Sequence, residues 1–431
     1  MSEPLSAVNL GAGPSTPDQP LSVVIGLESM ALGGCPINAL DLGRSLRERG
    51  HTVNVFAIDE PGPVSIASYA ERSGFPLTRI DARAGALART RQIRRFADAH
   101  SADVIHVFAP WLGSAAVASI GGRSRRIAVV TNWTMENVRY TPRQTPMIVG
   151  TRAMQVEAQG FHGAAVHLME PPVDIEAELA GARGAAEFRL AAGLADDDIV
   201  VTIVSRIASI MKAESIGYAI AALGRLDHPR LRLVIVGDGD AFDEIAGRAE
   251  AMNSRLRRPA VVLTGALDDP RSAYAAADVV MGMGGSALRA MAHSKPVIVL
   301  GERGFAKALE PRTIPYFLES GFYGTEPAAD PIAVLSEQLE SLIDPQRGVE
   351  LGRIGHELVI SKFGLGAATD SLVSMYRAEI RRGAGTAART VFGLETLVRA
   401  MAHQGRAATK RRLDSMRGRV GTPVDASRTE G

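Results

Sequence analysis

The stretch that decides the fold is Leu21–Ile58, LSVVIGLESMALGGCPINALDLGRSLRERGHTVNVFAI. The apolar run at 21–26 predicts a buried strand, and 40–50 has helical spacing with Gly50 as the expected C-cap. A second apolar run follows at 52–58. Apolar strands on both sides of a helix indicate a parallel sheet with helices covering both faces.

The same alternation of apolar runs and helical patterns continues along the chain. The sequence EPPVD at 170–174 interrupts it, because proline cannot donate the hydrogen bond that a helix interior or a central strand requires. A second series begins after this turn. The strands expected in the two series lie at 103–108, 127–131, 147–149, 166–169, 199–204, 231–236, 260–264, 279–281 and 296–300. The helices expected in the second series lie at 216–226, 241–253, 271–277, 287–293 and 331–343.

The predicted fold class is α/β, with two Rossmann-like doubly wound domains and a cleft between them. We expect a disordered leader, an N-terminal domain, a C-terminal domain, one further helix and a basic tail, at 1–19, 20–172, 173–362, 363–382 and 383–431. The leader lacks the order of residues of a signal peptide. The charges of the tail are interpreted as a solvated face, with contact to an anionic membrane surface as the alternative.

Composition excludes several classes of protein. The 431 residues carry 48 basic and 47 acidic side chains, a net charge of +1, and only 5% of the residues are aromatic. A nucleic-acid-binding protein usually has a marked basic excess and aromatic platforms, so nucleic acid is not an expected partner. The single cysteine, Cys35, allows no intrachain disulfide and fits a cytoplasmic protein. No apolar run is long enough to cross a membrane as a helix.

A basic pair follows the first expected strand of the second domain. Ser205 and Arg206 end the strand at 199–204, and Lys212 lies further along the same loop. The carboxyl ends of parallel strands face the ligand crevice, where a guanidinium and an ammonium can converge on a diphosphate. Ordinary surface charge is the alternative interpretation.

Two glycine loops are candidates for anion binding through backbone amides. The loop at 281–289, MGMGGSALR, follows a strand and opens a helix, so its amides can cradle a phosphate. The residues expected to form this cradle are Gly284, Gly285, Ser286 and Ala287. In the first domain, Gly33 and Gly34 join a strand to a helix in the same way. A tight turn is the alternative at both places, and the loop at Gly33 and Gly34 lacks the GxGxxG fingerprint of a dinucleotide site.

One acidic residue is a candidate for contact with a sugar. Glu302 follows the strand expected at 296–300, and a carboxylate there can accept hydrogen bonds from ribose or sugar hydroxyls; a surface turn is the alternative. The sequence contains no carboxylate dyad and no His/Cys cluster with metal-ligand spacing. These features together predict a nucleotide diphosphate in the cleft, with no metal or other cofactor.

The motifs, taken in order, resemble those of the retaining GT-B glycosyltransferases of family four, from about Leu21 to Arg377. They are LGG at 32–34 with LDLGRSLRERGHTV at 40–53, PVD at 172–174, VSR at 204–206 with Lys212, LVIVGDG at 233–239, TG at 264–265, YAAAD at 274–278 and AMAHSKPV at 290–297. The resemblance implies two Rossmann-like domains and a nucleotide-sugar donor. It also implies that the helix near Phe363 crosses back to the first domain.

The resemblance is incomplete at the loop 281–289. The family usually has two glutamates eight positions apart there, one at the donor sugar and one at the ribose, whereas this chain has Met281 and Arg289. Glu302 is therefore expected to replace the ribose contact, and the backbone of Leu267 to pair with the base. The variant loop resembles that of a bacterial natural-product subgroup.

The acceptor is expected to contact the first domain. His106, Asn132 and Trp133 lie at or near strand ends, where the family often places histidines. An indole wall beside an amide donor can orient an acceptor. The alternative for His106 is a hydrogen-bonded core histidine, because it lies inside an apolar strand.

We therefore expect an enzyme that transfers a sugar, with retention, from a GDP- or UDP-linked donor to a small alcohol, amine or thiol. Arg206 and Lys212 are the expected catalytic residues, because both can stabilise the departing diphosphate. Bacterial antibiotic or thiol metabolism is the expected context. A silent nucleotide-sugar-binding homologue that acts as a partner or regulator is the alternative, and a nucleotide-sugar epimerase is a third interpretation. A homodimer is left open.

Overall fold

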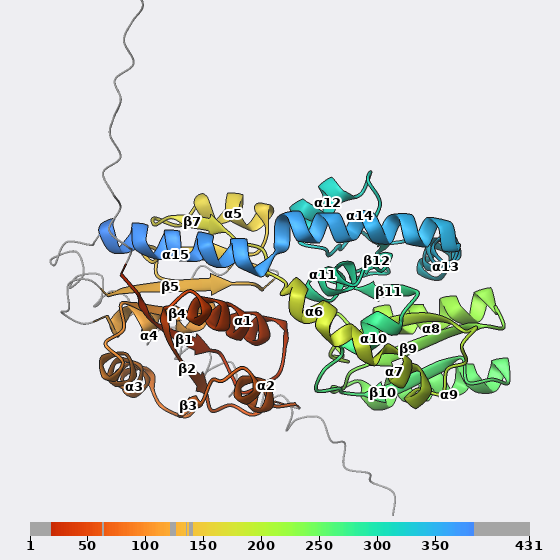
Figure 1. Ribbon diagram of the computed structural model, residues 1–431, viewed down its shortest axis with the longest axis horizontal. Helices are drawn as coiled ribbons and strands as arrows, with labels where there is room; N and C mark the ends of the chain where they lie inside the picture. The colour runs from red at the N-terminus through yellow and green to blue at the C-terminus, as the bar shows by residue number, and fades with distance from the viewer. Residues whose placement is uncertain (1–18, 63, 121–125, 135, 138–140, 383–431) are drawn as a thin grey trace, which may run out of the picture.

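The computed structural model describes residues 19–62, 64–120, 126–134, 136–137 and 141–382. Apart from residue 19, the predicted leader and the basic tail lie outside the described residues. Figure 1 shows two α/β domains beside each other along the longest axis, each built on one twisted sheet with helices on both faces. The predicted fold class is confirmed. None of the described helices is long and apolar enough to cross a membrane.

The N-terminal domain contains a seven-stranded parallel sheet in the order β3-β2-β1-β4-β5-β6-β7. Its strands are β1 (Ser22–Leu27), β2 (Thr52–Ile58), β3 (Leu77–Ile80), β4 (Val104–Val107), β5 (Ile127–Asn132), β6 (Met147–Val149) and β7 (Val166–Leu168). Its helices are α1 (Gly34–Glu48), α2 (Ala67–Arg72), α3 (Ala86–Ala99), η1 (Pro110–Leu112), α4 (Gly113–Ala118) and α5 (Arg152–Gln159). The central strands are buried on both faces, which explains their continuous apolar runs.

The C-terminal domain repeats this design with six strands in the order β10-β9-β8-β11-β12-β13, of which only β13 is antiparallel to its neighbour. Its strands are β8 (Ile199–Val204), β9 (Leu231–Val236), β10 (Val261–Gly265), β11 (Val279–Gly282), β12 (Val297–Leu300) and β13 (Ala306–Ala308). Its helices are α6 (Ile175–Gly181), η2 (Ala182–Gly184), α7 (Ala185–Ala191), α8 (Ala213–Leu226), α9 (Phe242–Leu256), α10 (Arg271–Ala276), α11 (Gly285–Ala292), α12 (Ile314–Ser320), α13 (Pro331–Leu342) and α14 (Pro345–Phe363).

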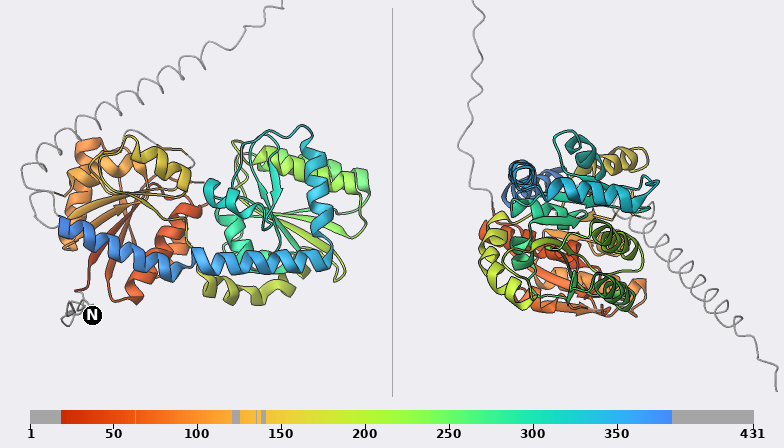
Figure 2. Two further views of the ribbon diagram at one scale, coloured as in Figure 1. Left: turned by 90° about the horizontal axis from the view of Figure 1, so that it is seen from above. Right: turned by 90° about the vertical axis from the view of Figure 1, so that its right-hand side faces the viewer.

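The chain passes between the domains twice, and the two passages touch. Val173 and Gly364 form a parallel bridge, in which the Val173 amide donates to the Phe363 carbonyl at 2.7 Å and the Leu365 amide donates to Val173 at 3.0 Å. After this bridge, α15 (Leu365–Arg382) lies along the N-terminal domain and buries Tyr376 in its core. Figures 1 and 2 show α14 and α15 running one after the other across both domains.

Three of the differences from the sequence-based expectations have clear local reasons. The helix expected at 40–50 begins six residues earlier, at Gly34, because Pro36 is tolerated in a first turn whose amides need no partner. The edge strand β3 has two exposed residues in four and therefore no apolar run. The long helix α14 was not expected, because its apolar positions are separated by glycine and charged residues.

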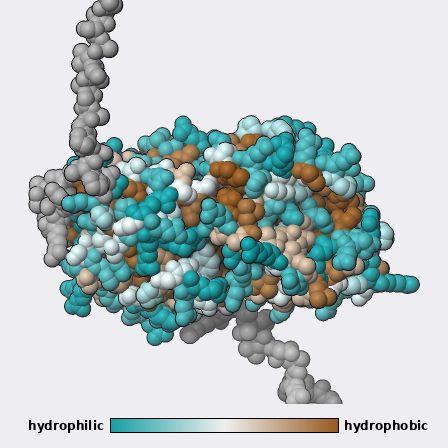
Figure 3. Space-filling model, in the orientation of Figure 1, coloured by the Kyte–Doolittle hydropathy of each residue, from teal (hydrophilic) through white to brown (hydrophobic). Residues whose placement is uncertain are grey.

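The surface is mostly hydrophilic, with apolar residues in small patches on the face drawn in Figure 3. The large apolar side chains that are exposed are scattered over different elements, from Leu87 of α3 to Ile360 of α14. Scattered exposed apolar residues are normal for a folded protein.

Candidate functional site

A pocket lies at the carboxyl ends of β8, β11 and β12. It brings three predicted site residues together: Ser205 and Lys212 from the loop after β8, and Ser286 from α11. The other lining residues are Ile203, Val204, Ser215, Ile216, Gly282, Met283 and Leu300. Burial, with a smaller contribution from the Arg206 charge, lowers the pKa of the half-buried Lys212 to about 8. Because Lys212 and Arg206 lie close enough for their positive charges to repel each other, an anion bound beside them would stabilise both.

The residues of the predicted glycine cradle lie at the start of α11, but some of their polar groups already have partners in the protein. Gly284 has φ +55 at the N-cap, a conformation that favours glycine, and its amide donates to the Phe322 carbonyl at 2.8 Å. The Ser286 hydroxyl donates to the Val204 carbonyl at 2.9 Å, and Ala287 is fully buried. The Ser286 amide donates to the Met283 carbonyl at 3.3 Å, so Gly285 is the residue that offers its amide in the first turn, at the positive end of the helix dipole.

The predicted contacts to the nucleoside lie on two loops, one after β12 and one after β10, which are on opposite sides of β8 in the sheet. Glu302 follows β12, and its carboxylate accepts a hydrogen bond from the Tyr323 hydroxyl at 2.5 Å; Glu302 itself does not line the pocket. Leu267 follows β10, and its side chain packs against the apolar cluster around Phe188. In the first domain, Gly33 and Gly34 begin α1, and a Cβ at Gly34 would meet open space.

His106 does not reach the cleft. It is fully buried between β5 and α15, with Nδ1 2.6 Å from the Tyr376 hydroxyl and Nε2 2.6 Å from the Thr131 hydroxyl. Burial lowers the pKa of its imidazole to about 3, which keeps the ring neutral. The structure corrects the acceptor-binding role expected for His106, because both ring nitrogens serve to join the last helix to the sheet.

The other two predicted acceptor residues also have structural partners. Asn132 is fully buried; its amide donates to the Glu136 carbonyl at 3.0 Å, and its oxygen accepts from the Thr134 hydroxyl at 2.6 Å. The Trp133 indole donates to the Met169 carbonyl at 2.8 Å. Asn132 therefore shapes a loop rather than facing a ligand, and Trp133 offers at most one face of its ring.

Glu28 is a cleft residue that the sequence analysis missed. It directly follows β1 and is exposed, and the amide of Met30 in the same loop donates to the Glu60 carbonyl at 2.9 Å. Partial burial raises the pKa of the Glu28 carboxyl, while the Trp111 indole and the Arg206 charge lower it. Glu28 therefore lies within electrostatic reach of Arg206 of the other domain. Its position at the carboxyl end of a central strand was the signal that could have identified it.

Cys35, beside the two glycines of the first domain, is not an activated thiol. Its sulfur lies 3.6 Å from the Phe108 carbonyl, and burial raises the pKa of the thiol to about 12. A thiolate is the nucleophilic form of cysteine, so this residue has a packing role. In the described part of the chain, no group of three or more His, Cys, Asp or Glu side chains is arranged to hold a metal ion.

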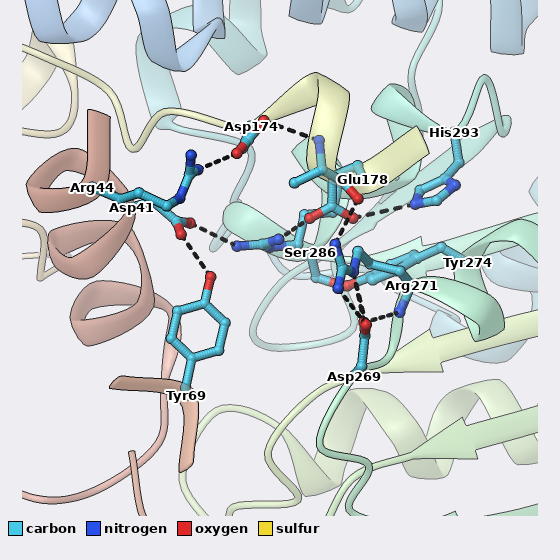
Figure 4. A network of polar contacts seen from close by, with 12 residues as sticks. Asp41, Arg44, Tyr69, Asp174, Glu178, Asp269, Arg271, Tyr274, Ser286 and His293 are labelled. Carbon is cyan, nitrogen blue, oxygen red and sulfur yellow. Dashed lines mark hydrogen bonds and ion pairs between the residues drawn. The ribbon is translucent and has the colours of Figure 1, made fainter. Parts of the chain in front are cut away.

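Arg289, which replaces a glutamate of the family pattern, lies between the domains. Its guanidinium forms ion pairs with Glu178 of α6 and with Asp41 of α1. Figure 4 shows the surrounding network, in which the Tyr69 hydroxyl points at Asp41 and the His293 ring points at Glu178. The position thus carries an interdomain contact in place of a carboxylate.

Two family models match this chain, one over each domain for most of its length. Residues 33–186 match the model described as "Glycosyl transferase 4-like domain", and residues 198–341 match "Glycosyl transferases group 1". The two domains are those of a GT-B glycosyltransferase. Comparison of this glycosyltransferase with curated protein sequences gave no match.

The glycosyltransferase fold is also found in solved structures with low sequence identity. HepE from Anabaena in complex with UDP-glucose has a TM-score of 0.64 and 17% identity, covering 83% of this chain and 100% of HepE. A glycosyltransferase from Rickettsia africae has a TM-score of 0.63 and 12% identity, covering 83% and 98%. The S. aureus TarM mutant in complex with fondaparinux, alpha-GlcNAc-glycerol and UDP has a TM-score of 0.61 and 10% identity, covering 83% and 99%. At these identities the likeness concerns the fold.

Proposed function

We propose that this glycosyltransferase moves a sugar from a UDP- or GDP-linked donor to a small acceptor, with retention of the anomeric configuration, as a family-four enzyme. The observation that carries the proposal is the pocket lined by Lys212, which lies within electrostatic reach of Arg206, and by Ser286 in the first turn of α11. Two cations and a helix N-terminus form a site of the right chemistry for a diphosphate.

The chemistry assigned to this pocket is stabilisation of a leaving group. The bond from the anomeric carbon to the diphosphate oxygen breaks, a new bond forms to the acceptor on the same face, and the acceptor proton passes to the departing diphosphate. Arg206, Lys212 and the Gly285 amide stabilise the charge that grows on the diphosphate. The proposed step needs no protein nucleophile, because the departing diphosphate itself takes the acceptor proton.

The acceptor side of the proposal rests on Glu28. Its carboxylate can accept a hydrogen bond from a hydroxyl or pair with an ammonium, and the half-buried Trp111 ring beside it provides an apolar wall. We propose a small alcohol, amine or thiol as the acceptor, used in the cytoplasm in bacterial natural-product or thiol metabolism. The variant loop 281–289 supports this context, because it departs from the common family pattern.

The first test is a ligand panel. Thermal unfolding of the purified full chain is measured with UDP, GDP, ADP and dTDP; a ligand present at 100 times its Kd stabilises the fold by about 2.7 kcal/mol. UDP or GDP is expected to stabilise, and a Lys212→Ala variant is expected to lose the effect. The matching nucleotide sugar is then assayed for hydrolysis and for transfer to a panel of small acceptors. Absence of binding by any diphosphate contradicts the proposal, and tight binding without either reaction supports a silent homologue.

A further inference from the structure

A series of polar contacts begins in the N-terminal domain and passes through Arg289. The Tyr69 hydroxyl of α2 donates to Asp41 Oδ1 of α1 at 2.6 Å. The other oxygen of Asp41 lies 3.8 Å from Arg289 Nη2, and Arg289 Nη1 donates to Glu178 of α6. Arg289 is therefore the side chain through which α11 of the C-terminal domain contacts α1 of the N-terminal domain by charge.

The series continues from Glu178 to the donor pocket. Glu178 Oε2 lies 3.2 Å from His293 Nε2, and the His293 ring stacks on Tyr274 with centroids 5.8 Å apart. The Tyr274 hydroxyl donates to Ser286 Oγ at 3.0 Å, and Ser286 in turn donates to the Val204 carbonyl at 2.9 Å. Ser286 and Val204 both line the pocket. Side-chain contacts thus connect the donor pocket to the opposite domain (Figure 4).

The two carboxylates that contact Arg289 are buried. Glu178 is 1% exposed and Asp41 is 5% exposed, and Arg289 contacts both carboxylates. Burial raises the pKa of the Asp41 carboxyl, and the Arg289 charge opposes that rise. Removing the guanidinium leaves two buried carboxylates without the cation they share, which is strongly unfavourable. The domains can avoid this cost by moving apart and admitting water.

The helix between the domains is held independently of Arg289. Asp174 caps α6 through the Ala177 amide at 3.0 Å and also pairs with Arg44 of α1. On the opposite side, Arg271 donates to the Ala177 carbonyl at 2.6 Å. Loss of Arg289 should therefore leave α6 in place and alter the contact between α1 and α11.

We propose that Arg289 is a positioning residue, which holds the diphosphate cradle of α11 in register with the N-terminal domain that binds the acceptor. This inference rests on the proposed function, because register between the domains matters only if a donor on one reacts with an acceptor on the other. It also assigns a role to the arginine at a position where the family pattern has a glutamate. Transfer needs both domains, whereas binding of a nucleoside diphosphate needs the C-terminal pocket.

The test separates transfer from binding in the full-length chain. Arg289→Gln is expected to lower kcat for transfer at least tenfold and to change the Kd for UDP, or for GDP if that is the nucleotide bound, less than threefold. Arg289→Lys should recover part of kcat, because it keeps the charge. Asp41→Asn, in the other domain, should give a similar loss, and the double variant should be little worse than Arg289→Gln, since the two residues act together. Arg353→Gln, at an exposed pair with Glu357 on α14, is the matched control and should leave kcat unchanged.

Each alternative outcome has a distinct meaning. If Arg289→Gln weakens nucleotide binding more than tenfold at unchanged kcat, Arg289 contacts the nucleotide and the positioning role is wrong. Wild-type kcat in Asp41→Asn, or strictly additive losses in the double variant, also overturns it. If Arg289→Gln fails to fold, Tyr69→Phe removes a single hydrogen bond to Asp41 and must still lower kcat without altering the Kd. Absence of transfer by the unaltered chain refutes the proposed function and, with it, the positioning role.

Discussion

The hydroxyl of Tyr376 lies 2.6 Å from Nδ1 of His106, although the two residues are 270 positions apart in the chain. Tyr376 is on α15, which follows the C-terminal domain, and His106 is on β4 in the middle of the N-terminal sheet. Both side chains are fully buried. The last described helix is therefore part of the N-terminal core, and the N-terminal domain is complete only when the rest of the chain has folded back onto it.

The His106 imidazole predicts sensitivity to acid. Its pKa falls from 6.5 to about 3 on burial, so the unfolded chain takes up a proton below pH 6.5 while the folded chain does not. This contribution to stability is complete above pH 6.5 and is lost at about 1.4 kcal/mol per pH unit as the pH falls towards 3. The measurement is the free energy of unfolding of the wild type minus that of His106→Gln, by chemical denaturation across this range. A difference that stays constant with pH contradicts the prediction.

The basic pair at the pocket is predicted to support turnover rather than folding. Arg206→Ala and Lys212→Ala should each lower kcat/KM by about 10²–10³, because each removes a group that stabilises the leaving diphosphate. Arg206 is exposed and Lys212 half-buried, so the thermal midpoint of neither variant should fall greatly. Steady-state kinetics with the nucleotide sugar and circular dichroism on the same samples are the measurements. Near-normal turnover in both variants would contradict the catalytic role proposed for Arg206 and Lys212.

The lowered pKa of Lys212 predicts a break in the pH profile. The ammonium loses its proton as the pH rises through about 8, so kcat/KM for the donor should fall tenfold per pH unit above that point. Lys212→Arg keeps its charge over this range and should remove the break. Lys307→Arg, at an exposed pair with Glu326, is the control and should retain it. If the pH profile of Lys212→Arg breaks at the same pH as that of the wild type, another group causes the break.

Gly237 is predicted to be required for the shape of the phosphate loop. It has φ +148, and a Cβ on it would lie 1.8 Å from the Ser205 carbonyl oxygen. Gly237→Ala should therefore push Ser205 and Arg206 away, destabilise the fold by about 1–3 kcal/mol and weaken nucleotide binding. Gly247→Ala, on α9 where a Cβ meets open space, is the matched control and should stabilise by about 0.5–1 kcal/mol. Calorimetric unfolding and titration with UDP test both; unchanged affinity in Gly237→Ala refutes the prediction.

Glu28 is predicted to act on the acceptor side of the cleft. Glu28→Gln keeps the size of the side chain and removes its charge, so KM for the acceptor should rise at least tenfold while KM for the donor stays within about twofold. Glu71→Gln, at an exposed position on α2, serves as the control. Bisubstrate kinetics provide both constants. A rise confined to the donor KM would place Glu28 with the nucleotide sugar instead.

The extent to which the sequence predicted the site depended on the range of the interactions. Ser205, Arg206 and Lys212 were predicted from a strand end and a loop, because the carboxyl end of a parallel strand faces the crevice in any doubly wound sheet. His106 was misassigned because an apolar strand gives no sign of which distant hydroxyls will meet a buried imidazole. Arg289 appeared only as a departure from a pattern, since its partners lie on helices from both domains.

The sequence by itself determined the parallel strands of the two sheets, the turn at Pro171 and Pro172, and the glycines and basic residues at the strand ends. These follow from local rules of apolar periodicity, backbone freedom and charge. The resemblance already implied that a helix near Phe363 returns to the first domain. Only the tertiary structure decided that Tyr376 of this helix joins the core, that His106 is buried beside it, and that Arg289 joins the domains. The physical reason is that burial and ion pairing depend on which segments meet in space, and these partners are separated by up to 270 residues.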